Sequence, residues 1–137
     1  MGFEFLDISG DAGVKAYGGS LAEAFESAAL GMYSLITDLE GIKEEKTVRI
    51  EKESRSIEGL LVAWLNELIF LFDAYGFIGK KITIDRLENN AVVSSVTGED
   101  FDAERHEQRL LIKAATYHDI KVENKGGRWE LSVIFDI

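Results

Sequence analysis

The chain has 137 residues, which is long enough to bury a hydrophobic core, and we expect one domain covering residues 1–137. Its 46% hydrophobic and 29% charged residues are typical of a globular protein, and the absence of cysteine from the sequence excludes disulfide bonds and thiolate metal sites. The formal net charge of −10 argues against strong direct binding of nucleic acid, because neutralising phosphates requires Lys and Arg, and it favours metal cations or a basic protein surface as partners.

The N-terminal part predicts two short strands followed by an amphipathic helix. The strands contain Phe3 and Phe5 and then residues 14–17, on either side of a turn-rich connector at residues 7–13. Residues 20–23, Ser-Leu-Ala-Glu, form a capping box, which marks the start of the helix. The first residues lack a basic region followed by an apolar one, so we expect no signal peptide and a cytoplasmic location.

The most apolar stretch of the chain, residues 56–76, predicts a buried central helix. Its large apolar side chains recur at three- and four-residue spacing and cover most of the helix circumference. The run is shorter than the ~20 apolar residues that a membrane span needs, and Asn66 and Glu67 would lie at its middle, so we expect no membrane insertion. We expect both side chains to cap or pair with neighbouring backbone. Ser56 is suited to cap the helix and Gly76 to end it.

The rest of the chain is dominated by alternating polar and apolar residues, which indicate strands. The predicted strands are 47–51, 81–85 and 91–97 as a hairpin, an extended run at 110–118, and 129–135 after a turn at 126–127. Together these elements predict an α+β fold in which two long helices pack on a largely antiparallel or mixed sheet.

The sequence contains no phosphate-binding loop, dinucleotide fingerprint or nucleophile elbow. We interpret His106 and His118 as surface or internally satisfied histidines. At residues 98–104, alternating carboxylates resemble the first ligands of a calcium-binding loop, but Arg105 and Leu111 stand where that loop requires Gly and Glu. We therefore interpret this segment as a solvated acidic loop that begins a short helix.

The most informative carboxylates lie near the two ends of the chain. Asp136 follows an apolar run that should lie deep in the sheet, and with the α-carboxylate of Ile137 it makes an anionic corner. If the first strand pairs near the last, Asp11 joins this corner and three oxygen ligands are available for calcium or magnesium. The alternative is that Asp136 only caps a strand edge and pairs with a lysine.

Several segments stand in an order that spans almost the whole chain. They are Phe-Leu-Asp-Ile-Ser-Gly-Asp-Ala-Gly-Val at 5–14, Ala-Tyr-Gly at 16–18, Leu-Ala-Glu-Ala-Phe at 21–25, Leu-Val-Ala-Trp-Leu-Asn-Glu-Leu at 61–68, Gly-Glu at 98–99, Lys-Ala-Ala-Thr-Tyr-His at 113–118 and Val-Ile-Phe-Asp-Ile at 133–137. In this order they resemble the archease family. The Lys-Ala-Ala-Thr-Tyr-His block and the Phe-Asp-Ile ending are the most specific of them.

The resemblance implies a partner protein and not an enzyme. Archeases are small acidic partners of the GTP-dependent RNA ligase that joins tRNA halves during splicing: they promote its guanylylation, sustain its multiple turnover and broaden its nucleotide use. An older proposal makes them chaperone-like modulators of a tRNA methyltransferase. The resemblance further implies a metal site at Asp11, Asp136 and the carboxylate of Ile137, and it places Lys113 on the functional surface.

One motif departs from the family pattern. The family usually has Asp-His-Thr-Ala-Asp where this chain has Asp-Ile-Ser-Gly-Asp at residues 7–11, so Ile8 replaces the histidine. This affects partner recognition more than the metal, because Asp11 is kept. Three alternatives remain open. Lys113 forms a structural ion pair with Asp136 or Asp11 and has no direct functional role. The chain acts as a chaperone, although we expect the core to bury its apolar stretches, or it is a hydrolase that uses Asp7 and Asp11.

Overall fold

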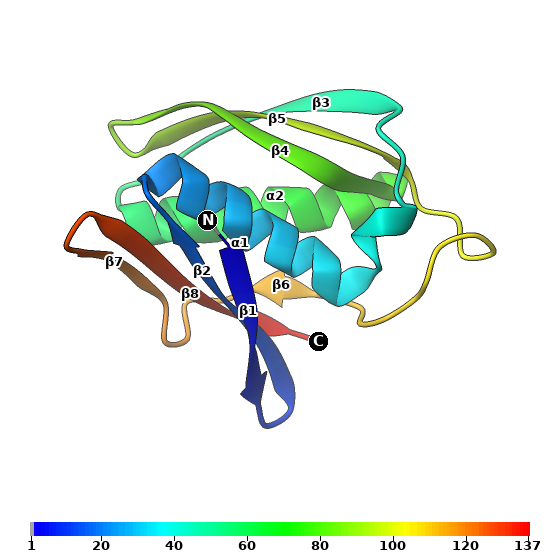
Figure 1. Ribbon diagram of the computed structural model, residues 1–137, viewed down its shortest axis with the longest axis horizontal. Helices are drawn as coiled ribbons and strands as arrows, with labels where there is room; N and C mark the ends of the chain where they lie inside the picture. The colour runs from blue at the N-terminus through cyan, green and yellow to red at the C-terminus, as the bar shows by residue number, and fades with distance from the viewer. Residues whose placement is uncertain (1) are drawn as a thin grey trace.

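The computed structural model describes residues 2–137, in which two α-helices lie between two antiparallel sheets (Figure 1). The helices are α1 (Leu21–Ile36) and α2 (Ile57–Tyr75), and a 3-10 turn, η1 (Leu39–Gly41), follows the first. The strands are β1 (Gly2–Ile8), β2 (Asp11–Gly18), β3 (Lys46–Glu53), β4 (Phe77–Glu88), β5 (Ala91–Asp100), β6 (Ala114–Ala115), β7 (Lys121–Lys125) and β8 (Arg128–Asp136).

Strands from the two ends of the chain form one sheet, in the order β1-β2-β8-β6 with β7 also paired to β8, which we call the terminal sheet. The middle of the chain forms a second sheet, β3-β5-β4, which we call the middle sheet. The α+β class is confirmed, whereas the expectation of a single sheet is corrected. Helix α2 is apolar around most of its circumference, so one sheet cannot cover it and a second is needed on the other side.

Helix α2 begins and ends where the sequence predicts. The hydroxyl of Ser56 accepts a hydrogen bond from the N–H of Gly59 at 3.0 Å, and Gly76 takes the left-handed conformation (φ 72°) that ends the helix. Trp64 is fully buried, and its indole N–H donates to the hydroxyl of Ser94 in the middle sheet at 2.9 Å. The prediction of a buried central helix is therefore confirmed, and neither helix in residues 2–137 is both long and apolar enough to cross a membrane.

Helix α1 packs between β2 and β4 and carries the predicted cap. Ser20 accepts a hydrogen bond from the N–H of Glu23 at 3.1 Å. Gly31 faces β2 so closely that a Cβ there would lie 2.6 Å from Val14 Cγ1, which explains why the helix has no side chain at this point. At the other end of α1, the guanidinium of Arg109 donates to the carbonyl of Ser34 at 2.9 Å, so a distant segment satisfies the end of the helix.

Three local predictions are corrected by the structure. The expected connector at residues 7–13 is only a two-residue turn, because β1 and β2 pair over their whole length, from Gly2↔Tyr17 to Ile8↔Asp11, and Gly10 alone supplies the left-handed backbone. Residues 98–100 belong to β5 and no helix follows them. The extended run at 110–118 contains only the short strand β6, and beside it Lys113 and Thr116 each donate one backbone hydrogen bond to β8.

Candidate functional site

Asp11, Lys113 and Asp136 lie at the same end of three adjacent strands of the terminal sheet. The last pair between β2 and β8 is Ala12↔Phe135, so Asp11 and Asp136 are the next residues along each strand. On the other side of β8, the N–H of Lys113 donates to the carbonyl of Asp136 at 2.8 Å. The strand order therefore brings together residues that stand at positions 11, 113 and 136 of the sequence.

Both aspartates occupy the outer face of the terminal sheet, away from the helices. Successive side chains of a strand point to opposite faces, so Asp136 shares a face with Ile134, while Phe135 points into the core and is fully buried. Asp11 likewise alternates with Ala12, which is part of the core. The buried residues thus fix the orientation of the acidic ones.

A side chain of the central helix holds β6 in position. Asn66 donates through its amide nitrogen to the carbonyl of Ala115 at 3.2 Å and accepts from the N–H of Ala115 at 2.8 Å. Thr116 then donates through both its N–H and its hydroxyl to the carbonyl of Ile134. The expectation that Asn66 pairs with neighbouring backbone is confirmed. Glu67 instead forms an ion pair with Lys52 at 3.1 Å, so the same expectation is wrong for it.

The charged groups at this corner have no partners among residues 2–137. Neither the carboxylates of Asp11 and Asp136 nor the ammonium of Lys113 takes part in an ion pair within 4.0 Å, so neither of the structural ion pairs considered from the sequence is present in this part of the chain. Asp11 is half-buried, whereas Asp136 and Lys113 are exposed. Carboxylate oxygens without a cationic partner are suited to bind calcium or magnesium.

Two aspartates alone do not complete a metal site. Within residues 2–137, no three acidic or histidine side chains lie together so that they could hold a metal ion. Because calcium and magnesium take six or more oxygen ligands, the remaining ligands would have to come from the carboxylate of Ile137, from water or from a partner. The donors present fit a hard cation that is shared with another molecule.

A second charged cluster lies at the end of β5 and is fully satisfied. The carboxylate of Glu99 accepts from Arg105 at 2.5 Å, from the backbone N–H of Lys43 at 2.5 Å, and contacts the Nε2 of His106 at 3.2 Å. The Nδ1 of His106 accepts from the N–H of Asp102 at 2.8 Å, so Nε2 carries the proton that is donated to Glu99. Glu99 and His106 are both buried.

The Arg105 guanidinium is the main reason that the pKa of Glu99 is lowered to about 2 from its ordinary value of 4.5, and the backbone N–H of Lys43 and the His106 ring lower it further against the opposing effect of burial. Glu99 therefore stays ionised, and its hydrogen bonds tie Arg105 and His106 to Lys43, in the segment before β3. The interpretation of residues 98–104 as a solvated loop is wrong for Glu99. That of His106 as a satisfied histidine is confirmed.

The aspartates that a hydrolase would combine do not share a face. Asp7 of β1 pairs with Ala12, whereas Asp11 pairs with Ile8, so the two carboxylates belong to opposite faces of the same hairpin. His118 is exposed, and its Nε2 lies 3.4 Å from the carboxylate of Asp119. This arrangement gives no support to the hydrolase interpretation.

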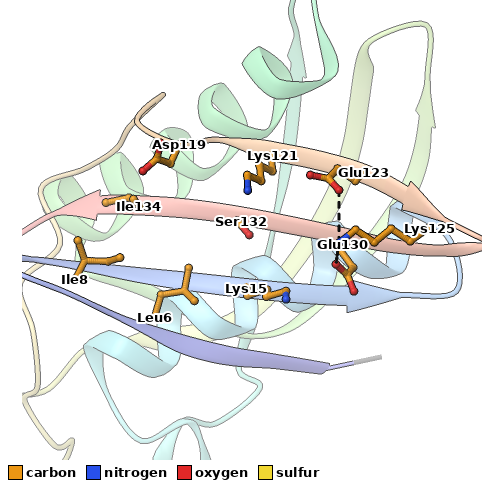
Figure 2. Close-up of a pocket in the computed structure, with 10 residues that line it drawn as sticks. All are labelled: Leu6, Ile8, Lys15, Asp119, Lys121, Glu123, Lys125, Glu130, Ser132 and Ile134. Carbon is orange, nitrogen blue, oxygen red and sulfur yellow. Dashed lines mark ion pairs between the residues drawn. The ribbon is translucent and has the colours of Figure 1, made fainter.

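The outer face of the terminal sheet also carries a hollow of about 470 Å³ between β1, β2, β8 and β7 (Figure 2). Lys15, Ser132 and Lys121 line one part of it, and Leu6 and Ile134 line another. This hollow could not be predicted from the sequence, because Lys15 and Lys121 belong to strands that are far apart in the chain and nothing in their local sequence links them.

The comparisons with known proteins agree over nearly the whole chain. The model of the archease protein family matches residues 3–137. The chain belongs to the archease family. Archeases of Sulfolobus acidocaldarius and Sulfurisphaera tokodaii are similar to it at 39% and 34% identity, and in each case the match covers 98% of both chains.

Two solved structures share the fold of this family member. The solution structure of protein 1598 of Methanobacterium thermoautotrophicum has a TM-score of 0.83 at 36% identity and covers 99% of both chains. The crystal structure of an archease from Thermotoga maritima, described as a possible chaperone, has a TM-score of 0.69 at 21% identity and covers 96% of this chain and 94% of that one. At that identity the second likeness concerns the fold alone.

Proposed function

We propose that this archease is a non-catalytic protein cofactor that promotes guanylylation and multiple turnover of the GTP-dependent tRNA-splicing RNA ligase. Its functional site is a divalent-metal site formed by Asp11, Asp136 and the C-terminal carboxylate of Ile137. The observation that carries the proposal is the strand register, which places Asp11 and Asp136 side by side on an exposed face with no cationic partner among residues 2–137.

The bound ion, calcium or magnesium, supplies positive charge that neutralises and orients phosphate oxygens. Asp11 and Asp136 would hold it through carboxylate oxygens, and the incomplete ligand set would leave positions for groups of the ligase or its nucleotide. The backbone N–H of Lys113 is hydrogen-bonded to Asp136, but Ala114 stands opposite Asp136, so the exposed Lys113 side chain belongs to the other face of the strand, at the rim of this corner. The two carboxylates are suited to present a bound cation to a triphosphate in the nucleotide pocket of the ligase.

A ligation assay with limiting ligase tests this proposal. We expect Asp136→Asn to lower the RNA joined per ligase molecule at least about tenfold, because the variant loses a charged metal ligand while keeping the size of the side chain. The matched control is Asp73→Asn, which removes the same charge from an exposed position on α2. If Asp136→Asn supports turnover as well as the wild type does, the proposal fails.

A second candidate function, chaperone-like modulation of the oligomeric state of a tRNA methyltransferase, is favoured by exposed apolar side chains. Phe70, Tyr75 and Leu111 expose 52%, 69% and 76% of their surface. This corrects the expectation that the core consumes every apolar stretch. Phe70 and Tyr75 contact each other edge to face, with ring centroids 6.1 Å apart, and aromatic residues are enriched in protein-binding sites.

Light scattering of the methyltransferase with and without this archease tests the second function. We expect Phe70→Ser to reduce the change in assembly, since Phe70 lies on the exposed side of α2, where polar substitution is tolerated. An unchanged assembly state on addition of the wild-type protein counts against this function.

A further inference from the structure

Three residues from three adjacent strands lie in one row across the terminal sheet. Lys15 of β2 stands opposite Ser132 of β8, and Ser132 stands opposite Lys121 of β7. Residues that are directly opposite share a face, with Cβ atoms about 5 Å apart. All three line the hollow on the outer face, where the two lysine side chains lie on either side of Ser132 (Figure 2).

Neither lysine is neutralised by an ion pair among residues 2–137. The acidic neighbours Glu123 and Glu130 are already held by Lys125, at 3.6 and 3.0 Å. Two other carboxylates are near: Glu4 stands opposite Lys15 on β1, and Asp119 lines the hollow. In a chain with a net charge of −10, two lysines that flank Ser132 and form no ion pair within 4.0 Å among residues 2–137 give this row a positive charge that suits an anion, although Asp119, Glu123 and Glu130 also line the hollow.

The other half of the hollow is apolar. Leu6, Ile8 and Ile134 line it, and Gly13 stands between Leu6 and Ile134 in the strand register. A Cβ at Gly13 would lie 3.1 Å from the Cβ of Leu6, so the absence of a side chain at Gly13 leaves space between Leu6 and Ile134 on this face of the sheet. Ile8 extends the apolar wall.

We propose that this hollow binds a nucleotide, with its phosphate between Lys15 and Lys121. The hydroxyl of Ser132 donates a hydrogen bond to a phosphate oxygen, and the base lies against Leu6 and Ile134. The combination of a cationic half and an apolar half matches a ligand with a charged group and a flat ring, and a volume of about 470 Å³ is within the range of small-molecule sites.

The phosphate end of this hollow is separate from the proposed metal site, whereas its apolar end includes Ile8, which stands opposite Asp11. Ser132 and Asp136 stand on the same face of β8, four residues apart, which corresponds to about 13 Å along a strand. The lysines hold the phosphate without a metal ion, so nucleotide binding does not depend on the proposed function at Asp11 and Asp136.

The test is an NMR titration of isotope-labelled protein with adenosine monophosphate and with inorganic phosphate, both in the presence of EDTA. We expect amide shifts to concentrate around Lys15, Lys121 and Ser132, and the nucleotide to bind more tightly than phosphate because of the apolar wall. The double variant Lys15→Gln/Lys121→Gln should bind the nucleotide about tenfold more weakly. The control Lys43→Gln/Lys81→Gln removes the same charge from exposed positions outside the terminal sheet and should bind as the wild type does.

Three outcomes overturn the proposal. The first is the absence of saturable amide shifts at this row of residues. The second is an equal loss of nucleotide affinity in the control double variant, which would indicate unspecific attraction by net charge. The third is equal affinity for phosphate and nucleotide, which would exclude a base on the apolar wall. Because EDTA removes divalent ions, none of these outcomes bears on the metal site. Failure of Asp136→Asn in the ligation assay in turn leaves the nucleotide site intact.

Discussion

Two clusters of charge in this molecule differ in how well they are satisfied. At the end of β5, buried Glu99 receives hydrogen bonds from Arg105, His106 and the backbone of Lys43. At the end of β8, Asp136 and its neighbour Asp11 have no ion-pair partner within residues 2–137, and Asp136 is exposed. A satisfied cluster contributes to folding and has little capacity left for a ligand, whereas an unpaired one contributes little to folding and is available to bind.

The largest expected effect on stability is therefore at Glu99. Glu99→Ala leaves the ring N–H of buried His106 and the backbone N–H of Lys43 without their acceptor, and we expect the free energy of unfolding to fall by about 3 kcal/mol. Urea denaturation measures it. Asp136→Ala, at an exposed position, should change it by no more than about 0.5 kcal/mol. Equal losses in the two variants would contradict the distinction between the clusters.

Acid should weaken the same cluster selectively. The folded-state pKa of Glu99 is about 2, below its ordinary value of 4.5, so its contribution to stability is complete above pH 4.5 and is lost as the pH falls towards 2. We expect the free energy of unfolding of Glu99→Gln to fall less than that of the wild type over this pH interval, because the variant has no carboxylate there to protonate. Parallel pH profiles for the two proteins would show that Glu99 is not the group that responds.

A smaller effect on stability is expected at Asn66, through which α2 holds β6 beside Asp136. Asn66→Ala removes both hydrogen bonds to Ala115 and should lower the free energy of unfolding by about 1–2 kcal/mol. Hydrogen exchange should accelerate at the amide of Ala115, and ligase turnover should fall because Lys113 and Asp136 lose their fixed positions. The control Asn124→Ala removes a side chain that only caps the exposed turn at Gly127. Unchanged exchange at Ala115 would indicate that β6 is held without Asn66.

The smallest expected effect is stabilisation by calcium or magnesium. At a free ion concentration ten times the dissociation constant, binding to the folded state adds about 1.4 kcal/mol, which raises the Tm by a few degrees. Asp136→Asn should abolish this rise in a thermal melt, and Asp73→Asn should keep it. A rise of the same size in Asp136→Asn would place the ion elsewhere on the acidic surface.

Secondary-structure elements whose ends are set by residues close together in the sequence could be predicted from the sequence. The cap at Ser56, the stop at Gly76 and the apolar period between them act within a few residues of each other, so α2 was predicted with its ends. The division of the strands into two sheets was not predicted, since it depends on how many faces of the helices have to be covered. Glu99 was misinterpreted for a related reason: the N–H of Lys43 that it accepts from lies 56 residues away in the sequence, so the local acidic pattern does not show that this carboxylate is buried.

The candidate site shows the same division. The sequence alone determined the family, the helices and the identities of Asp11, Lys113 and Asp136 as the residues to examine. Only the tertiary structure decided that they meet, because pairing of β2 and β6 on either side of β8 brings together segments far apart in the chain. The row of Lys15, Ser132 and Lys121 depends on that pairing alone, since cross-strand register is a long-range property that no local pattern encodes.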